Sequence, residues 1–133
     1  MAKLITSPSN PLIKRIHSLH EKKFRVREGL FLAEGMRVVT EAVEAGVAPA
    51  WLIHGPDMED HPVLQRLVAA TEAAGGEVIE TSADVLRKLS RKDNPQSVLG
   101  VFTEFGRRLP DLDRNASYVW IVCESLKDPG NLG

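Results

Sequence analysis

Cysteine and aromatic side chains are both scarce in this chain of 133 residues. Its one cysteine, Cys123, cannot form an internal disulfide, and aromatic residues make up 5% of the sequence. A lone cysteine is typical of a reducing compartment, so we expect a cytoplasmic protein. Because Cys123 ends the apolar stretch 118–123, we expect a buried and unreactive thiol; a reactive thiolate needs a positively charged, partly open environment.

Long apolar runs are also missing. The sequence has no stretch of 18 apolar residues, and its first ten residues lack an apolar segment followed by a cleavage site. We therefore expect no transmembrane helix, no secretory signal and no membrane partner. With 43% apolar and 26% charged residues, the composition is typical of a soluble globular protein with one ordinary core.

The motifs of the common enzyme chemistries are absent as well. The sequence contains no phosphate-binding glycine loop, no dinucleotide-binding glycine motif and no recognisable Ser/His/Asp or Cys/His arrangement. His17 and His20 have the spacing of metal ligands on a helix. Zinc needs three or four converging ligands, and no further ligand cluster lies nearby in the sequence, so we expect no metal site.

Positive charge is present, but it is unevenly distributed under a net charge of −1. Residues 1–30 contain seven lysines and arginines against two acids, whereas residues 31–86 contain ten acids against two arginines. Two basic clusters flank the acidic middle. The N-terminal basic cluster is Lys14, Arg15, Lys22, Lys23, Arg25 and Arg27, and the second basic cluster is Arg87, Lys88, Arg91 and Lys92.

Grouped cations at helix ends and loops suit a phosphate backbone, so structured RNA is a candidate partner. A helix face rich in lysine and arginine is more often only a solubilising surface, and charge alone leaves both interpretations open. Because aromatic residues are few, recognition of phosphates and shape is favoured over base stacking.

Hydrophobic periodicity predicts alternating helices and strands. We expect helices at 10–23, 36–46, 63–75 and 83–91, and strands at 30–35, 49–55, 77–82, 97–105 and 118–123. Asn10 and Pro11 are suited to cap and begin the first, basic helix, and 24–29 is expected to be a basic connector. The pattern predicts an α/β sandwich with a parallel or mixed sheet at 1–105. The polar segment 106–117 is predicted to be a linker, and 118–133 the start of a second domain.

Four motifs in order resemble the SpoU (TrmH-type) RNA 2′-O-ribose methyltransferases of the SPOUT superfamily. The first is an Asn-Pro-x-Ile-Lys helix start, at Asn10, Pro11, Ile13 and Lys14. The second is Gly-x-Phe-x-x-Glu-Gly-x-Arg, at Gly29, Phe31, Glu34, Gly35 and Arg37. A Pro-Gln-Gly segment follows at 95–97, with Ser97 in place of glycine, and "DPGNLG" at 128–133 resembles the first motif of the catalytic domain.

The resemblance implies an RNA-binding domain with the α/β/α fold of kink-turn-binding ribosomal proteins, joined to a knotted SPOUT domain. That domain would bind S-adenosylmethionine and form a homodimer. Asn131 would lie near the ribose and the cofactor, and the arginine of the same motif would follow Gly133. We therefore expect residues 1–133 alone to bind no cofactor and to be inactive.

For the RNA surface we add Glu34 and Arg37 to the basic clusters, although an acid at a helix N-terminus has a purely structural explanation. The predicted contacts to ribosomal or transfer RNA are Lys14, Arg15, Lys22, Lys23, Arg25, Arg27, Glu34, Arg37, Arg91 and Lys92. Two alternatives remain: a free-standing kink-turn-binding protein without enzymatic activity, and an α/β scaffold whose basic clusters contact another protein.

Overall fold

The computed structural model describes residues 2–56, 58–92, 94–106 and 109–128. Its helices are α1 (Pro11–Ser18), α2 (Lys22–Glu28), α3 (Met36–Glu44), α4 (Pro62–Ala73) and α5 (Ala83–Leu89). Its strands are β1 (Lys3–Ile5), β2 (Leu30–Glu34), β3 (Trp51–His54), β4 (Glu77–Thr81) and β5 (Val98–Thr103), followed by a short 3₁₀ helix, η1 (Leu109–Asp111).

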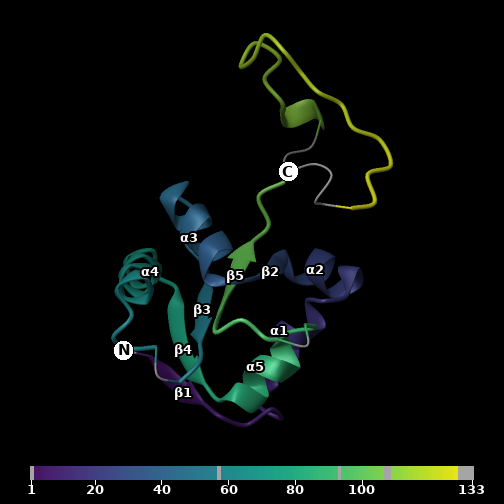
Figure 1. Ribbon diagram of the computed structural model, residues 1–133. Coiled ribbons are helices and arrows are strands. Elements are labelled where there is room, and N and C mark those ends of the chain that lie inside the picture. Colours follow the sequence, from purple (N-terminus) through teal and green to yellow (C-terminus); the bar gives the residue numbers. More distant parts are fainter. Residues whose placement is uncertain (1, 57, 93, 107–108, 129–133) are drawn as a thin grey trace.

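The strands form one mixed sheet in the order β1-β4-β3-β5-β2. β1, β4 and β3 are parallel, whereas β5 runs antiparallel to both β3 and β2. Helices α3 and α4 cover one face of the sheet, and α1, α2 and α5 lie on the other side (Figure 1). The predicted α/β class and mixed sheet are thereby confirmed.

Two hydrophobic cores explain why the central strands are apolar at nearly every position. Leu52 of β3 packs under α3 and α4, and its neighbour Ile53 packs under α1 and α5. Val78 and Ile79 of β4 alternate in the same way. Successive side chains of a strand point to opposite faces, so a sheet covered on both faces needs apolar residues throughout.

The predicted single helix at 10–23 is wrong. Asn10 caps α1 as expected, because its side chain accepts a hydrogen bond from the Leu12 amide at 2.9 Å. α1 then ends at Ser18, and the expected connector at 24–29 lies largely in α2, which ends at a left-handed Gly29. No glycine or proline marks the break between the helices. It depends on the Arg25 guanidinium, which bonds to the carbonyl groups of Leu19 and His20.

The prediction for 118–123 is also wrong, because these residues are not a strand and form no ladder with any described residue. Tyr118 and Val122 are fully or almost fully exposed, and Cys123 is exposed instead of buried. An apolar segment becomes a strand only when a partner accepts its backbone hydrogen bonds. Strand β1 was not predicted; it has only three residues, and its Ile5 carbonyl accepts the Thr81 hydroxyl at 2.5 Å.

Candidate nucleic-acid interface

The packing of α1 against α5 brings the two basic clusters together. Ile13 and Ile16 of α1 share a core with Val85 and Leu89 of α5. At the edge of this core the His20 ring nitrogen Nε2 lies 2.6 Å from the Leu89 carbonyl oxygen, across 69 positions of sequence. A carbonyl only accepts, so Nε2 carries the proton and donates. The clusters that the sequence separates therefore border one helical face.

The charges that act on His17 also show that the second basic cluster lies close to α1. Partial burial lowers the pKa of His17 below its ordinary value, and positive charge on His20, Lys88 and Arg91 lowers it further. Lys88 and Arg91 belong to the second basic cluster, and His17 lies in α1 beside the N-terminal one. Two cations of the second basic cluster thus act on an imidazole of α1, as expected if this cluster lies close to α1.

Four of the predicted RNA contacts are exposed and have no ion-pair partner among the described residues. They are Lys14, Lys22, Arg91 and Lys92. An unpaired, solvated ammonium or guanidinium group can neutralise a phosphate without first breaking an internal pair. These four residues are the best placed of the predicted set for contacts with a polyanion.

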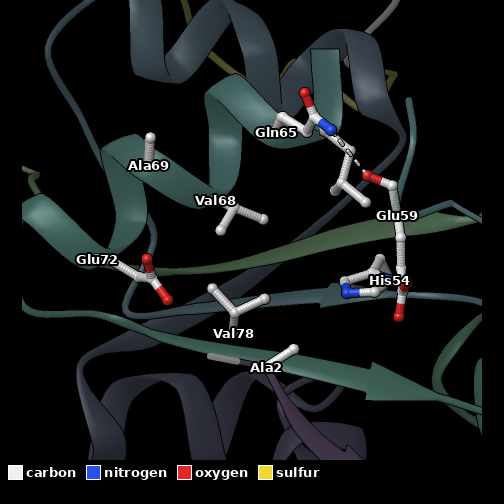
Figure 2. A pocket seen from close by; sticks show the side chains of 9 residues that line it. Ala2, His54, Glu59, Gln65, Val68, Ala69, Glu72 and Val78 are labelled. Carbon is white, nitrogen blue, oxygen red and sulfur yellow. Dashed lines mark hydrogen bonds between the residues drawn. The ribbon is translucent and has the colours of Figure 1, made fainter. Parts of the chain in front are cut away.

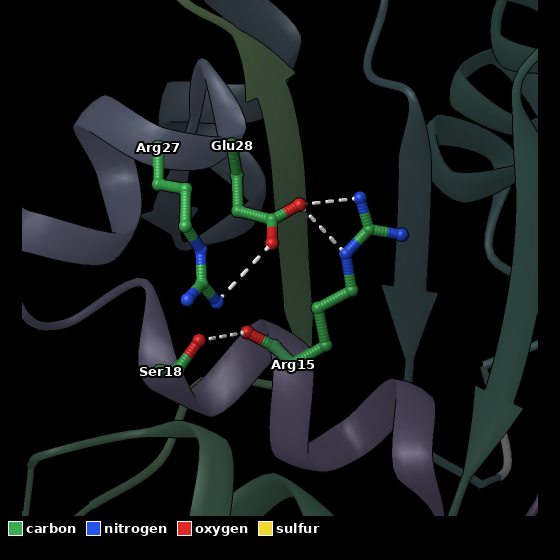
Figure 3. Close-up of polar contacts among 4 residues, drawn as sticks. All are labelled: Arg15, Ser18, Arg27 and Glu28. Atoms are coloured by element: carbon green, nitrogen blue, oxygen red, sulfur yellow. Dashed lines mark hydrogen bonds and ion pairs between the residues drawn. The ribbon is translucent and has the colours of Figure 1, made fainter.

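Arg15 and Arg27 are instead held by one carboxylate. Figure 3 shows both guanidinium groups directed at Glu28, where Arg15 donates to Oε2 through Nε at 2.9 Å and Nη2 at 2.5 Å. Arg27 approaches Oε1 at 3.6 Å. The hydrogen bond from Arg15 is the main reason that the pKa of Glu28 is lowered. Glu28 therefore neutralises part of the N-terminal basic cluster and ties α2 to α1.

Aromatic rings hold other cations of the N-terminal basic cluster. The Lys23 ammonium and the Arg27 guanidinium each lie 4.7 Å from the centre of the Phe24 ring, and the Arg15 guanidinium lies 5.1 Å from that of Trp51. Lys23 also pairs with Glu21 at 3.2 Å. Such cation–π contacts orient the side chains and leave much of each one exposed.

Arg25 has a structural role that the sequence did not indicate. Its Nη1 donates to the Leu19 carbonyl at 3.0 Å and to the His20 carbonyl at 2.9 Å. The last carbonyl groups of a helix have no partner within it, so a cation at this end satisfies them and complements the helix dipole. Arg25 thus holds the turn between α1 and α2.

Glu34 and Arg37 lie where β2 passes into α3. Gly35 between them has φ 120°, a conformation that other residues rarely adopt, and its amide bonds to the Val98 carbonyl. The Arg37 side chain is 90% exposed and donates to Glu41 at 2.9 Å, which raises its pKa. Glu34 accepts hydrogen bonds from Ser90 and Gln96, two residues that sequence reasoning did not select.

The histidines do not assemble a metal site. His17 and His20 meet edge to face with ring centres 5.5 Å apart, but His20 bonds to the Leu89 carbonyl. Within the described ranges, no group of three histidine, cysteine, aspartate or glutamate side chains is placed to hold a metal ion. Likewise, none of the described helices is long and apolar enough to cross a membrane.

A hollow of about 310 Å³ lies on the opposite side of the sheet, between α4 and β4 (Figure 2). Its walls are mostly apolar, including Val68 and Val78, and His54 lies at one end. The His54 side chain is 3% exposed, and its Nδ1 donates to the Gly55 carbonyl at 2.9 Å. The hollow has no lysine or arginine in its lining and is not part of the basic face. Asn131, the predicted catalytic residue, lies outside the described residues.

This geometry defines a three-layer α/β domain with a basic helical face. A sequence profile described as the MRM3-like substrate binding domain matches residues 10–100. The chain therefore belongs to the family of MRM3-like substrate-binding domains found in SpoU-type RNA methyltransferases.

Named relatives agree with this assignment. An uncharacterized tRNA/rRNA methyltransferase of Synechocystis sp. is 35% identical over 97% of this chain and 46% of its own length. The crystal structure of an rRNA methyltransferase from Sinorhizobium meliloti, also solved with AdoMet bound, is 34% identical with a TM-score of 0.74. That match covers 84% of this chain and 40% of the other.

A solved RNA 2′-O ribose methyltransferase is 32% identical with a TM-score of 0.70, over 98% of this chain and 48% of its own. The chain thus spans 40–48% of the length of these three relatives. The family assignment rests on residues that include both basic clusters, since the profile runs from Asn10 to Gly100.

Proposed function

We propose that this chain is the RNA-binding part of an S-adenosylmethionine-dependent RNA 2′-O-ribose methyltransferase acting on ribosomal or transfer RNA. The observation that carries the proposal is the joining of two distant basic clusters on one face by the contact between α1 and α5. The unpaired cations Lys14, Lys22, Arg91 and Lys92 contact phosphates, and the rigid helices set their spacing.

Structured RNA is favoured over a single strand. The cations project from two helices and a loop that the core holds in place, and the described basic face has few aromatic side chains on which bases could stack. Recognition of RNA shape through phosphates and ribose hydroxyls fits such a surface. We extend the proposal to kink-turn-like RNA, because the resemblance to SpoU-type methyltransferases implies a domain with the fold of kink-turn-binding ribosomal proteins.

The methyl transfer itself belongs to a domain of which 118–133 is the beginning, after a linker at 106–117. S-adenosylmethionine would supply the methyl group, and by the resemblance Asn131 would lie near the ribose. The reaction requires the 2′-oxygen to be held in line with the methyl group and its proton to be removed. Residues 1–105 contribute to this reaction by binding and orienting the RNA. We further propose a homodimer through the catalytic domain and a cytoplasmic location.

The test is RNA binding by fluorescence anisotropy, with a labelled RNA hairpin that contains an internal loop. Two double variants reverse the charge of one basic cluster each: K22E/K23E and R91E/K92E. Each variant should weaken RNA binding about tenfold or more and make the affinity less sensitive to salt. The apparent slope of log affinity against log salt should fall by roughly 0.7–0.9 per lost phosphate contact.

Arg66→Glu is the matched control, because Arg66 is an exposed arginine of α4 on the opposite side of the sheet. It should leave the affinity nearly unchanged. If wild-type binding is insensitive to salt, or if both double variants bind like the control, the basic face is not an RNA interface.

A further inference from the structure

Glu34 joins the end of β2 to the loop between α5 and β5. Its Oε1 accepts the Ser90 hydroxyl at 2.6 Å and the Gln96 backbone amide at 3.2 Å. The two donors lie 56 and 62 positions away in the sequence. Hydrogen bonds to a carboxylate are stronger than those between neutral groups, so this residue holds both ends of the loop.

The rest of the loop is built on the same contact. Ser90 is 6% exposed, and its hydroxyl oxygen also accepts the Lys92 amide at 3.1 Å while it donates to Glu34. On the other side, the Ser97 carbonyl accepts the Gly55 amide at 2.8 Å. The described loop residues, 90–92 and 94–97, are therefore tied to β2 and to the end of β3.

The loop presents Arg91 and Lys92, which have no ion-pair partner among the described residues. Both side chains are exposed, and the backbone of Lys92 is fixed through Ser90. Two flexible cations on an unsupported loop would lose conformational freedom on binding a phosphate. A loop that is already held requires less ordering when RNA binds.

We propose that Glu34 is a positioning residue, which holds the α5–β5 loop so that Arg91 and Lys92 meet RNA phosphates, and that it does not contact RNA itself. This inference rests on the proposed function. The Glu34 carboxylate already accepts two hydrogen bonds, and its negative charge would repel a phosphate. This proposal differs from the prediction made from the sequence, in which Glu34 contacts RNA directly.

The first experiment needs no RNA. Amide hydrogen exchange by NMR on the 133-residue chain compares wild type with Glu34→Ala, Glu34→Gln and Ser90→Ala. In Glu34→Ala the Gln96 and Lys92 amides should exchange about tenfold faster or more, with β5 unchanged. Glu34→Gln keeps an oxygen acceptor and should recover much of the protection. Glu41→Ala, on the exposed surface of α3, is the control.

The second experiment measures binding of the labelled hairpin. Glu34→Ala and Glu34→Gln remove the same charge, but only the glutamine variant keeps an acceptor. A positioning role predicts that Glu34→Ala weakens binding about fivefold to tenfold while Glu34→Gln stays near wild type. It also predicts that R91A/K92A costs less affinity in the Glu34→Ala background than in wild type.

Each other outcome overturns the inference. Unchanged exchange in Glu34→Ala means that Glu34 does not hold the loop, and faster exchange with unchanged affinity means that the held loop does not serve RNA. Equal weakening by both Glu34 variants means that the charge itself is needed. Absence of RNA binding by wild type contradicts the proposed function instead, and the exchange data still decide whether Glu34 holds the loop.

Discussion

Arg25 illustrates how one arginine in a basic cluster can serve the fold. Replacement by alanine leaves the Leu19 and His20 carbonyl groups at the end of α1 without the guanidinium. We expect Arg25→Ala to lower the free energy of unfolding by about 1–3 kcal/mol, the range for hydrogen bonds to charged groups. Urea denaturation followed by circular dichroism measures this change.

Lys22→Ala is the matched control for Arg25, because Lys22 is exposed and has no described ion-pair partner. Its effect on stability should stay within about 0.5 kcal/mol. If the two variants are equally stable, the contacts of Arg25 do not support the fold. The comparison also separates the two causes by which a variant of Arg25 could lose RNA affinity.

At the scale of elements, the contact between α1 and α5 should depend on pH through His17. The pKa of His17 is lowered in the fold, by partial burial first and then by His20, Lys88 and Arg91, with Glu21 opposing. The unfolded chain therefore binds a proton more readily than the folded one. Stability is full above the unfolded pKa of about 6.5 and should decrease as the pH falls below it.

His17→Gln should flatten that decrease between roughly pH 7 and pH 5. NMR titration of the imidazole gives the pKa directly, and urea denaturation at several pH values gives the stability. A measured pKa of His17 at or above that of a free histidine contradicts this account of the contact.

The sequence predicted the main elements well where periodicity decides them, as in α4 and β4. It failed where side-chain or inter-strand contacts decide. At the break between α1 and α2, Arg25 donates to the Leu19 and His20 carbonyl groups of the turn, and the hydrophobic pattern does not indicate these contacts. The apolar segment 118–123 has a strong strand pattern but no partner among the described residues.

The same division applies to the site. The basic clusters could be found from composition, whereas their meeting required the fold. The ion pairs of the basic clusters could not be predicted from the sequence either. Glu28 is one of two acids in the first 30 residues, and only the structure places it between Arg15 and Arg27. Ser90 carried no sequence signal, and Gln96 was noted only as part of the Pro-Gln-Gly resemblance, because the role of both residues depends on the end of β2.

At the scale of the whole molecule, both cores are complete by Thr103. Among the described residues, 104–106 and 109–128 contribute to neither hydrophobic cluster. We expect a chain of residues 1–105 to unfold at the same urea concentration as residues 1–133 and to bind the RNA hairpin equally well. A large loss of stability or affinity in the shorter chain would place part of the domain in 106–133.

Binding of S-adenosylmethionine provides a second test at the scale of the whole molecule. Titration calorimetry with S-adenosylmethionine should detect no binding to residues 1–133, because the proposed function assigns RNA binding, and not the cofactor, to these residues. The control is the same titration on a full-length relative. Stoichiometric binding of S-adenosylmethionine to the 133-residue chain would contradict the proposal that these residues bind RNA and not the cofactor.

The antiparallel direction of β5 has a consequence for the distance between the RNA-binding loop and the point where the chain leaves the domain. Glu34 is paired with Leu99 at one end of β5, and Leu30 is paired with Thr103 at the other, from which the chain leaves toward the linker. A strand of six residues spans about 20 Å, so the loop with Arg91 and Lys92 and the exit of the chain lie at opposite ends of the sheet. If the proposed function holds, we expect the methylated ribose to lie well away from the phosphates that anchor the RNA, so that an oligonucleotide must bridge both places to be a substrate.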